Sequence, residues 1–158
     1  MACTYIAFGG NLGSPVAAFK EALMALNGTQ RCWVTKASGL YESPPFEASG
    51  PDYLNAVCEV MTTLKAPDLL KLMQSIELEA GRVRDFHHQP RQLDLDLLFF
   101  GQALISSQHL QVPHPRWSER AFVLLPLRDL APQKVSEHLL SAVSHQPIRA
   151  LGPWVDQS

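Results

Sequence analysis

Two carboxylates, Asp94 and Asp96, stand at alternate positions of an otherwise apolar segment, residues 93–100. Side chains two residues apart on an extended chain share a face, which would place the two Cα atoms roughly 6.6 Å apart. Carboxylate oxygens at this spacing suit one or two Mg²⁺ ions, and the cations would offset the repulsion between the two negative charges. The alternative is a strand whose polar face is only solvated.

Three arginines, Arg82, Arg84 and Arg91, lie in the polar segment that precedes this strand. A guanidinium group binds phosphate oxygens through two parallel hydrogen bonds. Together with Asp85, the aspartate pair balances the three positive charges, so bound Mg²⁺ would make the site positive and attractive to a polyphosphate. A loop of this length is also typical of lids that close over phosphoryl-transfer sites. A structural network of arginines and aspartates is the competing interpretation.

Residues further upstream could hold a flat heterocycle beside such a site. Tyr53 and Asn55 share a face of a predicted strand and would offer one stacking group and one hydrogen-bonding group. Residues 43–45 (SPP) form either a stiff wall for that ligand or only a turn. Residues 9–13 (GGNLG) match neither a dinucleotide fingerprint nor a Walker loop, and a tight turn explains them equally well.

The histidines give weaker indications. His87 and His88 near Asp85 invite a transition-metal interpretation, but adjacent side chains on an extended chain point apart and no third ligand is specified. His114, held between two prolines, is either a phosphate contact or an exposed turn residue.

These residues need helices and strands to position them, and the periodicity of the chain predicts a consistent set. Apolar alternation predicts strands, and apolar residues at three- and four-residue steps, with Ser, Pro and Gly at the ends, predict helices. The expected strands are residues 4–9, 32–41, 53–63 and 93–100, with a small hairpin within 104–112. The expected helices are 15–27, with Ser14 as N-cap, 66–80, 120–130 and 136–145. Residues 152–154 (GPW) are expected to form a tail on the surface.

The order strand, helix, strand, strand, helix, strand is that of the split βαβ unit. It predicts an α/β (α+β) fold of ferredoxin-like type, with an antiparallel-rich sheet and both helices on one face. Within the last strand, Leu93, Leu95, Leu97 and Phe99 are expected on one buried face, opposite the two aspartates. Such a fold by itself identifies no function.

Length and composition exclude several classes of protein. The chain has 158 residues, a formal net charge of −2, 46% hydrophobic residues and 18% charged residues. These values predict one globular domain over residues 1–158 with no overall field for nucleic acid or anionic lipid. No apolar run approaches the roughly 18 residues of a membrane span, and the start lacks the pattern of a signal peptide. Three distant cysteines, Cys3, Cys32 and Cys58, indicate core thiols and no disulfide framework. We therefore expect a cytoplasmic monomer without a nucleic-acid or membrane partner.

Taken together, the motifs resemble those of one enzyme family. The segments that carry the resemblance are 81–84 (GRVR), 90–98 (PRQLDLDLL) and 112–114 (VPH), supported by 9–12 (GGNL), 41–45 (YESPP), 51–56 (PDYLNA) and 76–78 (IEL). Over about residues 5–132 the chain is similar to the 6-hydroxymethyl-7,8-dihydropterin pyrophosphokinase (HPPK) family of folate biosynthesis. The Arg-x-x-Asp-x-Asp segment is the specific part of this match.

The resemblance implies a three-layer αβα arrangement and Mg²⁺-dependent transfer of diphosphate from ATP to the hydroxymethyl group of the pterin, with release of AMP. It implies that Asp94 and Asp96 hold two Mg²⁺ ions bridging the phosphates, with Arg82 and Arg91 as further catalytic residues. The residues that it implies for ATP are Gln74, Glu77, Arg82, Arg84, Arg91, His114 and Arg120. Those that it implies for the pterin are Ser43, Pro44, Phe46, Tyr53, Asn55 and Phe122. Such a transfer needs alignment and charge neutralisation more than a covalent nucleophile.

The chain departs from the family pattern between Arg84 and Arg91. Where the family usually has Arg-Trp-Gly-Pro-Arg, this chain has residues 87–91 (HHQPR) in a loop one residue shorter, so the stacking Trp is missing. Two alternatives to an active pterin diphosphokinase therefore stay open. One is a degenerate homologue that binds pterin or nucleotide with little turnover, and the other is a different metal-dependent phosphoryl-transfer or phosphohydrolase enzyme that shares the acidic strand.

Overall fold

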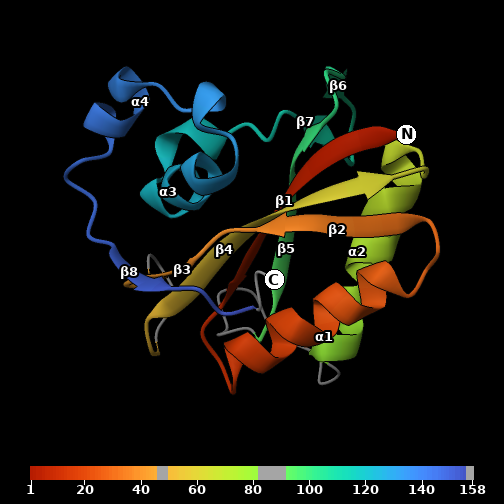
Figure 1. Cartoon of the computed structure of the whole chain (residues 1–158), viewed down its shortest axis with the longest axis horizontal. Helices are drawn as coiled ribbons and strands as arrows, with labels where there is room; N and C mark the ends of the chain where they lie inside the picture. The colour runs from red at the N-terminus through yellow and green to blue at the C-terminus, as the bar shows by residue number, and fades with distance from the viewer. Residues whose placement is uncertain (46–49, 82–91, 156–158) are drawn as a thin grey trace.

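The computed structural model in Figure 1 describes residues 1–45, 50–81 and 92–155. Its strands are β1 (Ala2–Gly10), β2 (Cys32–Ala37), β3 (Leu40–Ser43), β4 (Tyr53–Thr62), β5 (Asp94–Phe100), β6 (Ile105–Ser106), β7 (Gln111–Val112) and β8 (Arg149–Gly152). Its α-helices are α1 (Pro15–Asn27), α2 (Ala66–Ala80), α3 (Ala121–Leu130) and α4 (Glu137–Ala142). Short 3₁₀ segments, Trp117–Glu119 and Pro132–Lys134, flank α3.

The strand pairs of the main sheet are antiparallel throughout the described residues. The order is β5-β1-β4-β3-β8, and β2 also pairs with β4. Helices α1 and α2 cover one face of this sheet, and α3 and α4 lie on the other (Figure 1). The predicted ferredoxin-like order and the three-layer αβα arrangement are therefore confirmed, and β6 with β7 forms the predicted small hairpin.

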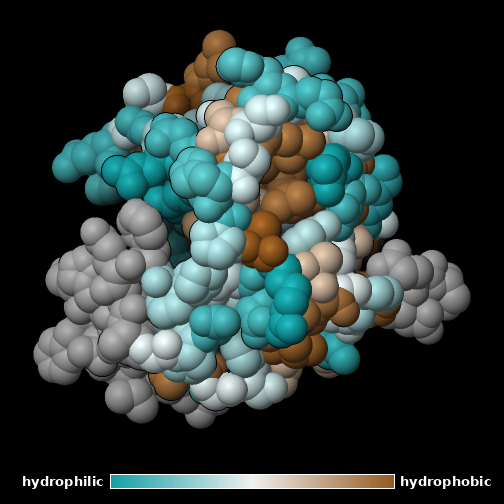
Figure 2. Space-filling model, turned by 90° about the vertical axis from the view of Figure 1, so that its left-hand side faces the viewer, coloured by the Kyte–Doolittle hydropathy of each residue, from teal (hydrophilic) through white to brown (hydrophobic). Residues whose placement is uncertain are grey.

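Each face of the sheet has its own apolar core. The first core lies beneath α1 and α2, and its buried side chains include Ile6, Phe8, Phe19, Leu26, Leu69 and Met73. The second lies beneath α3, and its buried side chains include Val57, Leu98, Leu124 and Leu127. Full burial of one such side chain contributes about 1.5–3 kcal/mol. The middle of the sheet is thus covered by packed side chains on both faces. The outer surface on the α3 and α4 side is mostly hydrophilic, with a central apolar band (Figure 2).

The helices follow their sequence patterns closely. The bounds of α2 are those predicted, because Leu69, Met73 and Ile76 all fall on its buried face. Ser14 precedes α1 as expected, but its side chain makes no capping hydrogen bond. Helix α4 ends at Ala142, earlier than the predicted residue 145. Within the described part of the chain, no helix has both the length and the apolar character needed to cross a bilayer.

The single strand predicted over residues 32–41 is wrong, because the chain divides it into β2 and β3. Ser38 lies at the break and replaces the strand pairing there. Its N–H donates to the Val57 carbonyl at 2.9 Å, and its Oγ accepts the Val57 N–H at 2.9 Å. Both halves therefore stay paired along β4, with β2 beside its second half and β3 beside its first.

The predicted face of Phe99 is also wrong. Leu93, Leu95 and Leu97 join the first core as expected. The register of β1 with β5 pairs Tyr5 with Phe99 but Ile6 with Leu97, so Leu98 is an extra residue in β5. A bulge of this kind reverses the alternation beyond it. Phe99 consequently lies in the second core, beneath α3.

The C-terminal segment is part of the core, contrary to the prediction of a surface tail. Strand β8 pairs with β3 at one edge of the sheet. Beyond it, Trp154 is buried with its ring centroid 5.6 Å from that of Phe19 and 6.4 Å from that of Phe8. Its indole N–H donates to the Ser38 carbonyl at 2.9 Å, so this residue also secures the break between β2 and β3.

Candidate active site

One row of residues crosses the α3 face of the sheet near one end of its strands. The registers align Asp94 of β5 with Gly9 of β1, Gly9 with Asn55 of β4, and Asn55 with Tyr41 of β3. Neighbouring strands are about 4.8 Å apart, so the Cα atoms of Asp94 and Asn55 are separated by about 10 Å. Gly9 has no side chain between them. This row, from Asp94 to Tyr41, is called the open row below.

The two predicted metal ligands share this face of the sheet. Asp94 lies opposite Gly9 and Asp96 lies opposite Ala7, so both precede the bulge and keep the same orientation. Asp94 is half-buried and Asp96 is exposed. Glu77 fastens their strand to α2, because its Oε2 accepts the Leu95 N–H at 2.7 Å. The strand that carries the carboxylates is therefore held from both sides, by β1 and by a helix.

His114 lies close to the carboxylates from a separate loop. The backbone N–H of His114 donates to the Leu98 carbonyl at 2.9 Å. In its ring, Nδ1 accepts the backbone N–H of Arg116 at 3.1 Å. The remaining ring nitrogen, Nε2, is therefore the one available to a ligand. Burial lowers the pKa of His114; the charge of Asp96 opposes this shift, whereas the charges of Arg120 and Arg116 add to it.

An open pocket of about 270 Å³ joins Asp96 and His114 to α2 and to the hairpin of β6 and β7. Its lining includes Leu70 and residues 107–111, which sequence reasoning missed. Leu70 could have been found by helical spacing, since it precedes the predicted nucleotide residue Gln74 by one turn. Gln74 itself is exposed. A larger pocket, of about 450 Å³, lies around Met1 and residues 62–67 and contains none of the predicted site residues.

The residues predicted to bind the pterin gather at the β3–β4 end of the open row. Asn55 is 5% exposed, and its Nδ2 donates to Ser43 Oγ at 2.9 Å and to the Tyr41 carbonyl at 3.4 Å. These bonds orient the amide so that Oδ1 is 3.6 Å from the place of a Cβ on Gly9. The carbonyl oxygen of Asn55 thus faces the open row.

The other predicted pterin residues within the described part of the chain are Tyr53, Pro44 and Phe122. Tyr53 pairs with Ser43 and is half-buried. Phe122 lies in the first turn of α3, where the guanidinium carbon of Arg120 is 5.5 Å from its ring centroid. Pro44 is exposed. Tyr53, Asn55 and Ser43 thus lie together on β3 and β4, and Phe122 lies on the helix that covers this face of the sheet.

The glycine loop after β1 connects these two halves. Asn11 is 2% exposed, and its Nδ2 donates to the Pro51 carbonyl, just before β4, at 3.0 Å. Gly13 has a φ of +67°, and a Cβ there would lie 2.8 Å from Nε2 of Gln92, just before β5. The positive φ favours glycine at this position, whereas the flexible end of Gln92 could move away from a Cβ. The loop thus packs against the segments that introduce both strands of the site.

Several predicted residues fall outside the described residues, namely Phe46, Arg82, Arg84 and Arg91, together with His87 and His88. Their roles stay predictions from the sequence. Cys32 and Cys58 are buried and Cys3 is half-buried, all three as free thiols, as predicted.

Comparison with known proteins gives a family match over most of the chain. The sequence profile of "7,8-dihydro-6-hydroxymethylpterin-pyrophosphokinase (HPPK)" matches residues 5–132. A Pseudomonas aeruginosa 2-amino-4-hydroxy-6-hydroxymethyldihydropteridine pyrophosphokinase is 45% identical over 129 residues, which cover 81% of this chain and 80% of the relative. The protein of the same name from Bacillus subtilis is 40% identical over 144 residues, which cover 90% and 85%.

Other similar proteins are much longer than this chain. A Dictyostelium discoideum folic acid synthesis protein is 39% identical, but the match covers only 19% of its length. A crystal structure of an HPPK-DHPS in complex with substrates has a TM-score of 0.67 at 12% identity, covering 92% of this chain and 45% of that one. The wild-type HPPK-DHPS of Plasmodium falciparum has a TM-score of 0.60 at 14% identity, covering 84% and 40%. These structures share the fold, and the sequence matches settle the family: the chain belongs to the 7,8-dihydro-6-hydroxymethylpterin-pyrophosphokinase (HPPK) family.

Proposed function

We propose that this chain transfers diphosphate from ATP to the hydroxymethyl group of 6-hydroxymethyl-7,8-dihydropterin, a step of folate biosynthesis. The hydroxymethyl oxygen forms a bond to the β-phosphorus of ATP, and the bond from that phosphorus to the α,β-bridging oxygen breaks. AMP leaves with that oxygen, and the hydroxyl proton passes to solvent. The observation that carries the proposal is the open row, where carboxylates and an amide flank the bare Gly9. Membership of the HPPK family supports it.

The carboxylate end of the open row is the part that we assign to Mg²⁺. Mg²⁺ is commonly held by one or two carboxylates, with phosphate oxygens and water completing its shell, and Asp94 with Asp96 fits that donor set. Residues 1–45, 50–81 and 92–155 contain no group of three or more His, Cys, Asp or Glu side chains that could hold an ion. Mg²⁺ bound by Asp94 and Asp96 neutralises phosphate charge.

Treatment with EDTA tests this assignment. We expect the chelator to abolish AMP formation and added Mg²⁺ to restore it in full. The two-ion arrangement predicts that the rate rises with Mg²⁺ beyond the concentration that saturates ATP. Turnover that persists in excess EDTA would remove the metal from the proposal.

On the nucleotide side, this chain's own residues bind and orient the triphosphate. His114 Nε2 can donate a hydrogen bond to a phosphate oxygen, since Nδ1 is already an acceptor. Arg120 adds positive charge beside it. The pocket at Leu70 offers an apolar wall to the nucleoside, with Gln74 one turn further along α2. Arg82, Arg84 and Arg91 are proposed to stabilise the charge that develops on the transferred group.

On the pterin side, the proposed contacts are one amide and two rings. The Asn55 Oδ1 accepts an N–H of the heterocycle, because the Nδ2 of the same amide is used by Ser43. Tyr53 and Phe122 are proposed to pack against the flat ring from β4 and α3, with Pro44 at its edge, and the role of Phe46 stays a prediction from the sequence. The hydroxymethyl group then points along the open row toward Asp94. This alignment is the main contribution that the chain makes to rate.

The decisive assay follows AMP from ATP, Mg²⁺ and freshly prepared hydroxymethyldihydropterin. The proposal predicts AMP and pterin diphosphate in equal amounts. Binding of pterin by calorimetry without AMP would indicate the degenerate homologue. ADP or free phosphate in place of AMP would indicate a different phosphoryl-transfer enzyme.

We also propose that residues 1–158 act as one domain and as a monomer. Two edge strands of the sheet have outward N–H groups that are bound by side chains of the same chain. The Val34 N–H of β2 donates to Asn27 Oδ1 at 2.9 Å, and the Leu95 N–H of β5 donates to Glu77. Edges closed in this way resist pairing with a second copy. Light scattering should give the mass of one chain, 17.5 kDa, and a dimer mass would contradict the proposal.

A further inference from the structure

Asp129, in the last turn of α3, joins this helix to the strand that carries one wall of the proposed pterin site. Its two carboxylate oxygens accept the Tyr41 hydroxyl at 3.0 and 2.9 Å. Its Oδ2 also accepts the N–H of Gly39, the residue just before β3, at 3.2 Å. Tyr41 is 7% exposed, so these bonds pass between two packed layers. They connect residues about ninety positions apart in the sequence.

The two elements that Asp129 joins each carry part of the proposed pterin site. Phe122 precedes Asp129 by seven residues, which is close to two turns, so both side chains lie on similar sides of α3. Ser43 follows Tyr41 by two residues on β3 and shares its face. The contact between Asp129 and Tyr41 therefore connects the helix that carries Phe122 to the β3 wall, beside the apolar packing of α3 on the sheet.

Tyr41 is also connected to the amide that faces the open row. Its carbonyl accepts Nδ2 of Asn55 at 3.4 Å, and the same Nδ2 donates to Ser43 Oγ at 2.9 Å. Tyr41 and Asn55 are direct partners in the register of β3 with β4. A shift of Tyr41 would therefore turn the Asn55 amide and displace the oxygen proposed to accept from the heterocycle.

The contact persists across the working pH range. Burial raises the pKa of Tyr41 to about 12; the hydrogen bond and charge of Asp129 act in the same direction, whereas the charge and hydrogen bond of Arg128 oppose them. The tyrosine therefore stays protonated and remains the donor at neutral pH. A hydrogen bond from a hydroxyl to a carboxylate is among the stronger ones in proteins.

We propose that Asp129 and Tyr41 are positioning residues that set the width of the pterin slot, acting through Phe122 and Asn55 without contacting ATP. This inference rests on the proposed function. It predicts a selective effect: loosening the contact weakens pterin binding and leaves nucleotide binding in place. If the contact were purely structural, its loss would lower stability and would change the KM values for pterin and ATP alike or leave both unchanged.

The test compares the variants Tyr41→Phe and Asp129→Asn with the wild type. For each, the KM for pterin, the KM for ATP and kcat are measured from AMP formation, and folding is checked by circular dichroism and urea unfolding. We expect the KM for pterin to rise about tenfold, equivalent to about 1.4 kcal/mol. The KM for ATP should stay within about twofold. Both changes weaken the contact between Tyr41 and Asp129, and Asp129→Asn also affects the bond from the Gly39 N–H, so the effect of the double variant should be smaller than the sum of the two single effects.

Glu42→Gln provides a matched control on the same strand. Glu42 lies next to Tyr41 but points to the other face of the sheet, where its Oε1 accepts from Arg149 of β8 at 2.6 Å. This change also removes a charged partner from β3, yet it leaves α3 untouched. Neither KM should change by more than about twofold.

The outcomes separate this inference from the proposed function. If the wild type forms AMP and both variants are folded with an unchanged KM for pterin, the positioning role is wrong. An equal rise in both KM values overturns it as well, since the effect is then not selective. If the wild type itself forms no AMP and binds no pterin, the proposed function fails first and the inference fails with it.

Discussion

Strand β4 carries two polar side chains on the same face, and they have opposite surroundings. Asn55 and Glu59 are four residues apart, and both project toward the side of α3. The β1 neighbour of Asn55 is Gly9, whereas the β1 neighbour of Glu59 is Tyr5. At the first position the sheet is left bare, and at the second a side chain occupies the same place.

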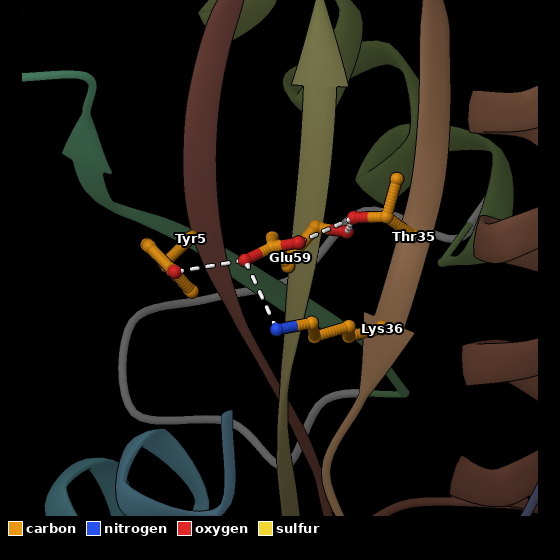
Figure 3. A network of polar contacts seen from close by, with 4 residues as sticks. All are labelled: Tyr5, Thr35, Lys36 and Glu59. Atoms are coloured by element: carbon orange, nitrogen blue, oxygen red, sulfur yellow. Dashed lines mark hydrogen bonds and ion pairs between the residues drawn. The ribbon is translucent and has the colours of Figure 1, made fainter. Parts of the chain in front are cut away.

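Around Glu59 the polar groups satisfy one another, and Figure 3 shows them converging on its carboxylate. Tyr5 donates its hydroxyl to Oε2 at 2.8 Å, and Thr35 donates to Oε1 at 2.7 Å. The ammonium of Lys36 is 4.0 Å from Oε2. Burial alone would raise the pKa of Glu59, but the bonds from Thr35 and Tyr5 and the charge of Lys36 outweigh it and hold the pKa below its ordinary value.

Asn55 and Glu59 lie toward opposite ends of the sheet, and the difference between them shows what makes a polar group accessible to a ligand. A carboxylate whose lone pairs are filled by neighbouring donors contributes to stability, because its charge is already compensated. Beside Gly9, no β1 side chain covers the face of the sheet on which Asp94 and Asn55 lie. The choice of Tyr5 or Gly9 on β1 therefore separates a structural end of the sheet from its proposed catalytic end.

The largest expected effect is the loss of Asp96 at the catalytic end. Asp96→Ala should lower kcat/KM about a thousandfold, equivalent to about 4 kcal/mol, because a proposed metal ligand is removed. Its side chain is exposed and supports no core, so the urea midpoint should stay near that of the wild type. Asp94→Ala should lose activity similarly. Retained turnover in both variants would contradict the metal assignment.

A side chain at Gly9 should close the open row directly. An alanine Cβ there meets Asn55 Oδ1 at 3.6 Å, an ordinary contact distance, so Gly9→Ala should cost less than about fivefold in the KM for pterin. The branched Gly9→Val would extend over the bare strand and raise this KM about thirtyfold. Urea unfolding of both variants shows whether a rise in the KM for pterin comes from filling the open row or from a loss of stability. If valine binds pterin as well as glycine does, the row is not the binding surface.

The shared face of Asp94 and Asp96 could be predicted from the sequence more reliably than the pairing in the rest of the sheet, for a physical reason. Asp94 and Asp96 lie within one strand, and period-two geometry is a local property that needs no partner. The bounds of α2 were likewise predictable because its apolar positions repeat every three or four residues. The fold order followed from counting these local elements.

What failed depends on partners far away in the chain. The reversed face of Phe99 comes from an extra residue opposite β1, and no pattern within β5 reveals that register. Ser38 breaks a strand because its hydroxyl and backbone both bind Val57. Trp154 enters the core because the strand before it, β8, pairs with β3 at the edge of the sheet. The contact between Asp129 and Tyr41 has no sequence signature at all.

At the structural end, Glu59→Gln should lower stability without lowering activity, the reverse of Asp96→Ala. We expect the free energy of unfolding at pH 7 to fall by about 1–2 kcal/mol, because hydrogen bonds to a charged acceptor become bonds to a neutral one. The lowered pKa of Glu59 gives a sign to the pH dependence. Its stabilisation is present above the ordinary glutamate pKa and is lost as the pH falls through the lower folded value.

The check is urea unfolding of both proteins from pH 7 down to pH 3. The gap between wild type and Glu59→Gln should narrow as the pH falls through this window. A gap that is constant with pH would show that the charge of Glu59 contributes nothing, and a loss of AMP formation would remove the distinction between the two ends.

The smallest effect tests which donor matters most to Glu59. Lys36 is 56% exposed and only reaches 4.0 Å, so solvent and salt screen its charge, and Lys36→Ala should cost at most about 0.5 kcal/mol. Thr35→Val removes a hydrogen bond of 2.7 Å at nearly constant shape and should cost about 1 kcal/mol. Added 1 M NaCl should remove the first difference and leave the second. If Lys36→Ala lowers the free energy of unfolding more than Thr35→Val does, the Glu59 carboxylate is compensated by long-range charge and not by direct hydrogen bonds. The contrast with the open row would then need another explanation.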